Sequence, residues 1–153
     1  MHIRPYKSAV DEASVLAVFD RTFPVSHSFL ERREQTEGRQ HLELLLGHAE
    51  TLIADFDGLV IGFIIVDDEG YISALYVDRR HAGRGVGSTL LQEAQNGYEW
   101  LRLHVFEENV SAVKFYRSRN FAVIDEDRQI DSSGRPHKRL EMDRASTGIS
   151  EGS

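Results

Sequence analysis

Three glycines at alternate positions, Gly83, Gly85 and Gly87, stand between a predicted strand and a predicted helix. Residues 71–77 are rich in β-branched and aromatic side chains, whereas residues 88–96 carry apolar side chains at helical spacing. Glycine lets the backbone approach a ligand closely, and free N–H groups at a helix N-terminus bind anions. Three arginines add positive charge around this turn: Arg79, Arg80 and Arg84. The pattern predicts a phosphate-binding turn; the alternative is a tight turn that needs glycine only for a positive φ.

Two common phosphate motifs do not fit this turn. A mononucleotide P-loop needs a lysine and a hydroxyl after its last glycine, but Gly87 is followed by Ser88 and Thr89. The dinucleotide fingerprint needs a third glycine where this chain has Ser88 or Leu90. A nucleotide-binding domain that uses the turn in another way stays open as an alternative.

The rest of the chain predicts a mixture of strands and helices. The predicted strands cover residues 2–5, 51–55, 59–66, 71–77, 100–105, 121–130 and 137–142. The predicted helices begin at Ser8, cover residues 26–47 with an interruption at Gly38, follow the glycine turn, and begin again at Asn109 or Ser111. Because a helix separates strands 71–77 and 100–105, these two are predicted to be parallel neighbours.

The order of these elements predicts a mixed α/β (α+β) fold, with a mostly antiparallel, twisted sheet and helices on both faces. The chain has 153 residues, 41% of them hydrophobic, which suits one domain, and we assign it to residues 1–144. Residues 145–153 are small and polar, so we expect a disordered tail.

Composition narrows the classes of partner. The formal net charge of -7 argues against nucleic-acid binding, since the lysines and arginines are scattered among more carboxylates, and favours a cationic small molecule or peptide. The absence of cysteine removes disulfides, thiolate metal ligands and a cysteine nucleophile. The longest apolar run, residues 59–66, is too short to span a bilayer, and residues 1–5 lack a signal-peptide pattern. We therefore expect a cytoplasmic protein without a membrane partner.

Two motifs in sequence order resemble the signatures of the GNAT superfamily of N-acetyltransferases. The first joins Leu75-Tyr76-Val77 to the glycine turn and Leu90-Leu91. The second runs from Leu103-His104-Val105 through Asn109, Ala112 and Phe115-Tyr116-Arg117 to Asn120-Phe121. Residues 26–30 and 131–138 are further similar to a bacterial branch, the YjaB-like acetyltransferases. The resemblance extends to about residue 143.

The resemblance implies acetyl-CoA as donor and a central parallel pair of strands that splay to admit it. It assigns cofactor binding to Leu75, Tyr76, Val77, Gly83, Arg84, Gly85, Val86, Gly87, Ser88, Asn109 and Tyr116. One departure stands at Ala82, where the family usually has glutamine or arginine, so one side-chain contact to the pyrophosphate is missing from the pattern.

Acetyl transfer to an amine needs a neutral amine, a polarised thioester carbonyl and a proton for the departing sulfur. The resemblance implies that Tyr116 donates this proton, and the alternative is a core aromatic beside Phe115. For the base, we consider Glu69, which otherwise lies in a solvated turn, and His104, which is otherwise a satisfied histidine of the sheet. A chain of waters without one essential base is the third possibility.

The acceptor side is less defined by the sequence. The YjaB-like resemblance places His27 and Phe29 at the substrate pocket, and the acceptor is an amine of a small molecule or a peptide. We expect no metal, because His41, Glu43 and His48 lack the spacing of a helical zinc motif and fit a solvated helix face. A non-catalytic acyl-CoA-binding or sensing module on the same fold is the leading alternative, and a monomer and a homodimer are equally compatible.

Overall fold

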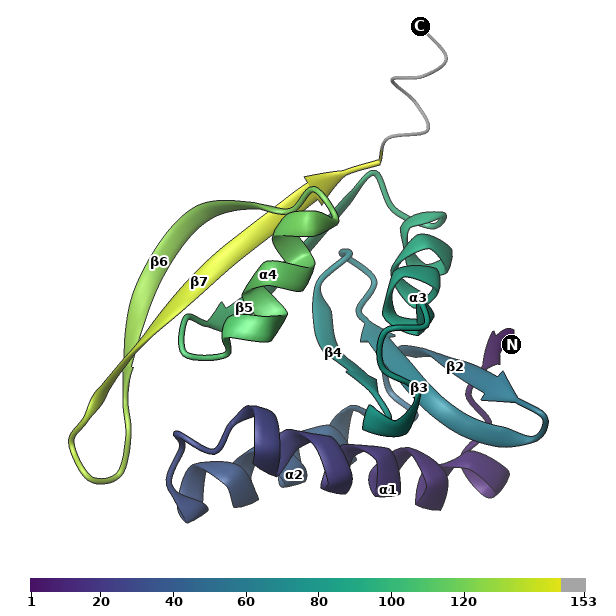
Figure 1. The fold of residues 1–153 in the computed structure, drawn as a ribbon, viewed down its shortest axis with the longest axis horizontal. Coiled ribbons are helices and arrows are strands. Elements are labelled where there is room, and N and C mark those ends of the chain that lie inside the picture. Colours follow the sequence, from purple (N-terminus) through teal and green to yellow (C-terminus); the bar gives the residue numbers. More distant parts are fainter. Residues whose placement is uncertain (147–153) are drawn as a thin grey trace, which may run out of the picture.

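The computed structural model describes residues 1–146 and consists of two sheets and four α-helices (Figure 1). In chain order the elements are β1 (His2–Pro5), α1 (Ser8–Ser26), α2 (Arg32–Leu45), β2 (Glu50–Phe56), β3 (Leu59–Val66), β4 (Ile72–Val77), a 3-10 helix η1 (Arg79–His81), α3 (Val86–Gln95), β5 (Trp100–Phe106), α4 (Val110–Ser118), β6 (Ala122–Ile130) and β7 (Pro136–Ala145). The mixed α/β class predicted from the sequence is confirmed.

The strands form one sheet in the order β1-β2-β3-β4 and a second in the order β5-β7-β6, with every pairing inside them antiparallel. The parallel neighbours β4 and β5 meet at one bridge, between Tyr71 and Arg102, where the Arg102 N–H donates to the Gly70 carbonyl at 3.0 Å. Beyond this bridge β4 and β5 diverge and belong to different sheets (Figure 1). The predicted parallel pair is therefore present only at its start.

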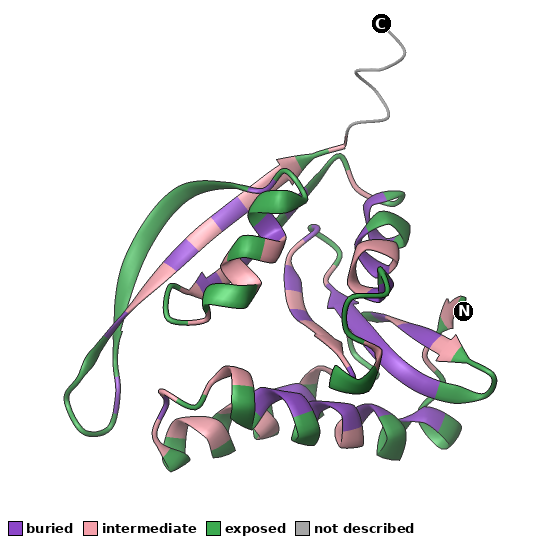
Figure 2. Cartoon of the chain, in the orientation of Figure 1, coloured by how far each residue is buried: buried purple, intermediate pink, exposed green. Residues whose placement is uncertain are grey.

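Alternating side chains on β3 supply the two halves of the core. Phe63 and Ile65 pack in the cluster that includes α1 and α2, whereas Ile64 and Val66 pack in the cluster that includes α3 and α4. The buried colour in Figure 2 follows β3 and the sheet-facing side of α1. Gly62 lets α3 approach this strand, because a Cβ there would lie 3.3 Å from a Val86 methyl carbon.

Gly38 does not interrupt a helix, contrary to the sequence prediction, and lies inside α2. A Cβ on Gly38 would come within 2.8 Å of the Phe23 ring of α1, so glycine at this position lets the two helices pack closely. The chain instead leaves the helical conformation at His27, which follows the last residue of α1.

The two ends of the described chain also differ from expectation. Ser8 does not cap α1: the residue before the helix is Lys7, whose N–H donates to the Asp11 carboxylate at 2.8 Å. Ala145, predicted to start the disordered tail, pairs with Trp100 at the end of β7, and residues 147–153 of that prediction lie outside the described residues. Across residues 1–146, no helix is long and apolar enough to cross a membrane.

Candidate functional site

The glycine turn connects η1 to α3, and its glycines have two structural roles. Gly83 and Gly85 have φ angles of +77° and +79°, which glycine adopts without steric cost, and Gly85 is the residue before the first turn of α3. Gly87 is needed for close packing, because a Cβ there would lie 3.1 Å from the Phe115 ring of α4. The free N–H groups at the start of α3 therefore face open space across residues that carry no side chain.

A cleft of about 740 Å³ runs between this turn, β4 and the start of α4. Its wall includes ten of the residues implied by the resemblance: Leu75, Tyr76, Val77, Gly83, Gly85, Val86, Gly87, Ser88, Asn109 and Tyr116. Arg84 is exposed and does not line it. The volume lies within the range of about 300–1,000 Å³ that cofactor sites occupy. The Asn109 side chain makes no capping bond to α4, which leaves its amide available to a ligand.

The positive charge of the cleft comes from Arg79 and Arg119. Arg80 turns away and forms an ion pair with Asp78, from its Nη2 to Oδ2 at 3.0 Å. Sequence reasoning missed Arg119, whose Nε donates to the Ser88 hydroxyl and whose guanidinium lies 5.5 Å from the centre of the Phe115 ring. Its position one turn after Tyr116 on the same helix is the signal that could have indicated it.

Asp78 fixes the position of η1, which precedes the glycine turn. Its buried carboxylate accepts the Arg80 N–H at 3.0 Å and the Arg21 Nη2–H at 2.7 Å. These hydrogen bonds, those from Arg80 first, keep the pKa of Asp78 well below its usual range. The carboxylate therefore stays ionised and ties η1 to α1.

A second cavity of about 360 Å³ adjoins the cleft and shares part of its wall. The two have five residues in common: Leu75, Tyr76, Asn109, Ala112 and Tyr116. The rest of the wall of the second cavity combines apolar residues such as Leu103 and Val105 with polar ones. The polar side chains include His27, His41, Tyr71, His104, Gln129 and Arg139. Tyr116 thus lies where the two cavities meet.

Tyr116 is both a core aromatic and a cavity residue. Its ring packs edge-on against Phe115 and Phe121, each at 5.4 Å between centroids. Burial raises the pKa of this phenol above its usual value. The hydroxyl therefore keeps its proton and can offer it to a ligand.

His104 and Tyr71 form a hydrogen-bonded pair in the second cavity, with 2.7 Å between the Tyr71 hydroxyl and Nδ1 of His104. Burial, aided by the charge of Arg139, lowers the pKa of His104 below its usual value. The imidazole is consequently neutral near pH 7 and can accept a proton. Sequence reasoning missed this role of Tyr71, because the pattern gives it only as the first residue of a strand.

Glu69, the other base considered, lies elsewhere. It is exposed in the turn before β4, where its N–H donates to the Asp67 carboxylate at 2.9 Å. It lines neither cavity. The structure does not bring it together with Tyr116 or His104.

His27 and Phe29 follow α1 and face different cavities. His27 lines the second cavity, stacks on Phe23 at 4.1 Å and shares a 2.7 Å hydrogen bond with the Ser26 hydroxyl. Burial lowers the pKa of His27 to about 4, so its ring is neutral. Phe29 lines the cleft. His41 is exposed on α2, as predicted, and also borders the second cavity. No metal-binding cluster is found within residues 1–146.

Comparison with known proteins agrees with this geometry. Residues 13–121 match the acetyltransferase (GNAT) family. The chain is 27% identical to the peptidyl-lysine N-acetyltransferase YjaB of Salmonella typhimurium over 129 residues, which cover 84% of this chain and 88% of YjaB. It is 29% identical to the Escherichia coli peptidyl-lysine N-acetyltransferase YiaC over 80 residues, 52% of this chain and about half (55%) of YiaC.

The same relationship appears in three dimensions. The solution structure of apo YjaB from Escherichia coli superposes with a TM-score of 0.78 at 26% identity, covering 93% of this chain and 95% of that one. The family match spans most of the chain and includes the glycine turn, β4 and α4, which line the cleft, and β5, which lines the second cavity. The chain therefore belongs to the acetyltransferase (GNAT) family and is an acetyl-CoA-dependent N-acetyltransferase.

Proposed function

We propose that this enzyme acetylates lysine side chains of peptides or proteins by direct attack within a ternary complex. One observation carries the proposal: Tyr116 belongs to the walls of both cavities, so a donor in the larger and an amine in the smaller meet at one hydroxyl. The names of the relatives YjaB and YiaC, both peptidyl-lysine N-acetyltransferases, support the lysine acceptor.

The cleft suits an anionic, elongated donor. The N–H groups at the start of α3, together with Arg79 and Arg119, would receive the pyrophosphate, and the backbone of residues 75–77 would bind the pantetheine arm. Ala82 lines the cleft at the position where the family usually has glutamine or arginine. Because Arg119 lines the same cleft, its guanidinium can supply the pyrophosphate contact that Ala82 lacks. The residues present therefore fit acetyl-CoA.

The reaction would use two side chains to move protons. Acetyl-CoA supplies the acetyl group as a thioester. The lysine nitrogen forms a bond to the acetyl carbon and the carbon–sulfur bond breaks; Tyr116 gives its proton to the sulfur, and His104 takes one from the nitrogen directly or through a water. Solvent returns a proton from His104 to Tyr116, so that the products are an amide and a thiol.

The second cavity supports this assignment on chemical grounds. Two of its histidines, the half-buried His27 and His104, have lowered pKa values and are uncharged, which favours the neutral form of an amine that must attack. His27 would contact the acceptor there and Phe29 would border it from the cleft. Since every residue assigned comes from one chain, the proposal holds for a monomer and for a homodimer. We place the reaction in the cytoplasm, where its donor is made.

The test is the Tyr116→Phe variant, with Tyr98→Phe as its control because Tyr98 lines neither cavity. We expect kcat with acetyl-CoA and a lysine peptide to fall by about 100-fold in Tyr116→Phe, while calorimetry gives unchanged acetyl-CoA affinity. Tyr98→Phe should match the wild type. Equal turnover in both variants would remove Tyr116 from the chemistry, and acetyl-CoA binding without turnover of any amine would favour the sensing module.

A further inference from the structure

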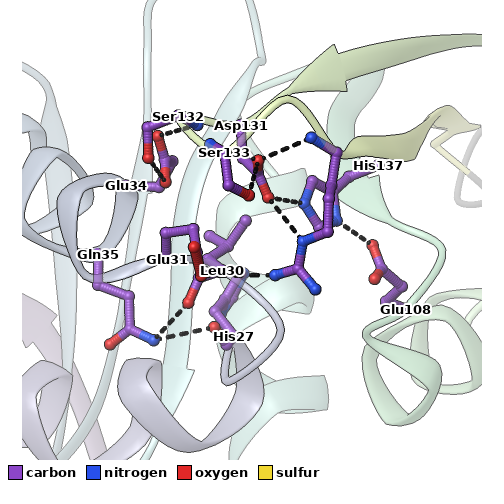
Figure 3. A network of polar contacts seen from close by, with 11 residues as sticks. His27, Leu30, Glu31, Glu34, Gln35, Glu108, Asp131, Ser132, Ser133 and His137 are labelled. Atoms are coloured by element: carbon purple, nitrogen blue, oxygen red, sulfur yellow. Dashed lines mark hydrogen bonds and ion pairs between the residues drawn. The ribbon is translucent and has the colours of Figure 1, made fainter.

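His137 is enclosed between two carboxylates next to the turn of the β6–β7 hairpin (Figure 3). Its Nε2 lies 2.7 Å from Asp131 Oδ2, and its Nδ1 lies 2.7 Å from Glu108 Oε1. The imidazole is only 4% exposed. Because each ring nitrogen faces an acceptor, the ring is held as an imidazolium, and the three residues carry one net negative charge.

Asp131 fixes this arrangement from within the hairpin turn. Its Oδ1 accepts hydrogen bonds from the backbone N–H groups of Ser133 and Arg135, each at 2.9 Å. Its side chain is 1% exposed and therefore unavailable to a ligand. Of the two carboxylates that hold His137, only Glu108 reaches solvent.

The hairpin turn is also tied to the start of α2. Glu34 accepts hydrogen bonds from the N–H and hydroxyl of Ser132 at 3.1 and 3.2 Å, and Glu31 lies 3.4 Å from the Arg135 guanidinium (Figure 3). These contacts engage Glu34 of α2 and Glu31, which precedes the helix. They also set the position of the turn that holds His137.

The hydrogen bond to His137 uses only one carboxylate oxygen of Glu108. Glu108 follows β5, lines the cleft next to Asn109, and has a side chain that is 42% exposed. Its Oε2 makes no hydrogen bond to the described residues. Among residues 1–146 it is the only carboxylate on the wall of either cavity.

The charge of Glu108 does not suit the donor. Acetyl-CoA carries its charges as phosphates, which a carboxylate repels, and the cations of the cleft, Arg79 and Arg119, lie on η1 and at the end of α4. A half-exposed carboxylate next to Asn109, which lines both cavities, instead attracts a cation that approaches with the acceptor.

We propose that Glu108, oriented by His137 and Asp131, binds a positive charge that the acceptor carries beside the reacting lysine. The preferred substrate is then a lysine with an arginine or lysine as a close neighbour. This inference rests on the proposed lysine acetylation and adds a sequence preference to it. The reacting amine itself is bound elsewhere, next to Tyr116 and His104.

The experiment compares two probes on the protein loaded with coenzyme A: a lysine peptide flanked by arginines and the same peptide flanked by alanines. Calorimetry gives the affinities, and steady-state kinetics with acetyl-CoA gives kcat/KM. The variants are Glu108→Gln and the control Glu107→Gln, whose side chain is exposed and lies 3.6 Å from the Lys138 ammonium. We expect the wild type and Glu107→Gln to favour the arginine peptide about fivefold, and Glu108→Gln to bind both peptides equally.

Each outcome decides the proposal. A preference that survives in Glu108→Gln, or is absent from the wild type, overturns it. Weaker acetyl-CoA binding by Glu108→Gln also overturns it, because the carboxylate would then accept a hydrogen bond from the pantetheine arm. If the arginine peptide binds preferentially but neither peptide is acetylated, the cation site is supported and lysine acetylation is refuted. If both peptides are acetylated without preference, lysine acetylation is supported and the cation site is refuted. Failure of both peptides to bind refutes both.

Discussion

The Tyr71 hydroxyl lies 2.7 Å from Nδ1 of His104, so each side chain fixes the orientation of the other inside the second cavity. Burial lowers the pKa of His104, which means that the base form persists to a pH below about 6.5, the usual histidine value. We predict that kcat/KM falls on the acid side only below that pH. In His104→Gln this acid limb should disappear and kcat should fall by about 10- to 100-fold. A pH–rate profile of both proteins checks this, and an unchanged acid limb would assign it to another group.

Gly85 should be more important for the donor than for stability. Gly85 and Gly58 have nearly the same φ, +79° and +84°, and a Cβ added to either would have no atom within 4 Å, but only Gly85 lines the cleft. Gly85→Ala and Gly58→Ala should each lower the free energy of unfolding by about 1 kcal/mol. Only Gly85→Ala should weaken acetyl-CoA binding in calorimetry. Equal binding by the two variants would show that the turn is structural.

Asp78 should link stability to acid pH. Its pKa is lowered in the folded protein, so its stabilising effect is present above the unfolded value near 3.9 and is lost as pH falls through the folded value. Asp78→Asn should lower the free energy of unfolding at pH 7 by about 1–2 kcal/mol, because its arginine partners are partly exposed. Urea unfolding at pH 7 and pH 3 measures this, with Asp68→Asn in an exposed turn as control.

His137 should have the opposite pH dependence. Its two carboxylate partners, Asp131 first, raise its folded pKa, so its stabilisation is complete below the unfolded value near 6.5 and is lost as pH rises through the folded value. The free energy of unfolding of the wild type should exceed that of His137→Gln by about 1–2 kcal/mol at pH 6, and by less at pH 9. Urea unfolding at the two pH values measures the difference. A pH-independent difference would mean that the ring acts through packing alone.

Local patterns in the sequence predicted most of the residues that line the cleft, whereas their binding of acetyl-CoA stays a prediction. The glycine turn, its position between a strand and a helix, and most of the cleft-lining residues follow from spacing and from the family motifs. The choice among arginines did not follow, because Arg80 and Arg84 are adjacent to the turn in sequence but only Arg79 and the distant Arg119 reach the cleft. Side-chain direction on a short 3-10 helix depends on partners such as Asp78.

The acceptor side depends on contacts between distant segments. Tyr71 and His104 are 33 positions apart, and Glu108, which follows β5, acquires its orientation from His137 on the paired strand β7. Such pairs leave no periodic signal in one sequence. Gly38 shows the same limit inside a helix, because glycine is required there by the nearby Phe23 ring of helix α1, which is distant in sequence.

The single bridge between Tyr71 and Arg102 leaves two strand edges facing each other across the interior of the domain. Backbone edges of this kind usually attract another strand, which makes them a risk for aggregation when they are exposed. Here the amide groups of a bound pantetheine arm would take the place of that strand. The bound arm would then cover the free edge of β4, and the fraction of enzyme with this edge covered would follow the concentration of acetyl-CoA.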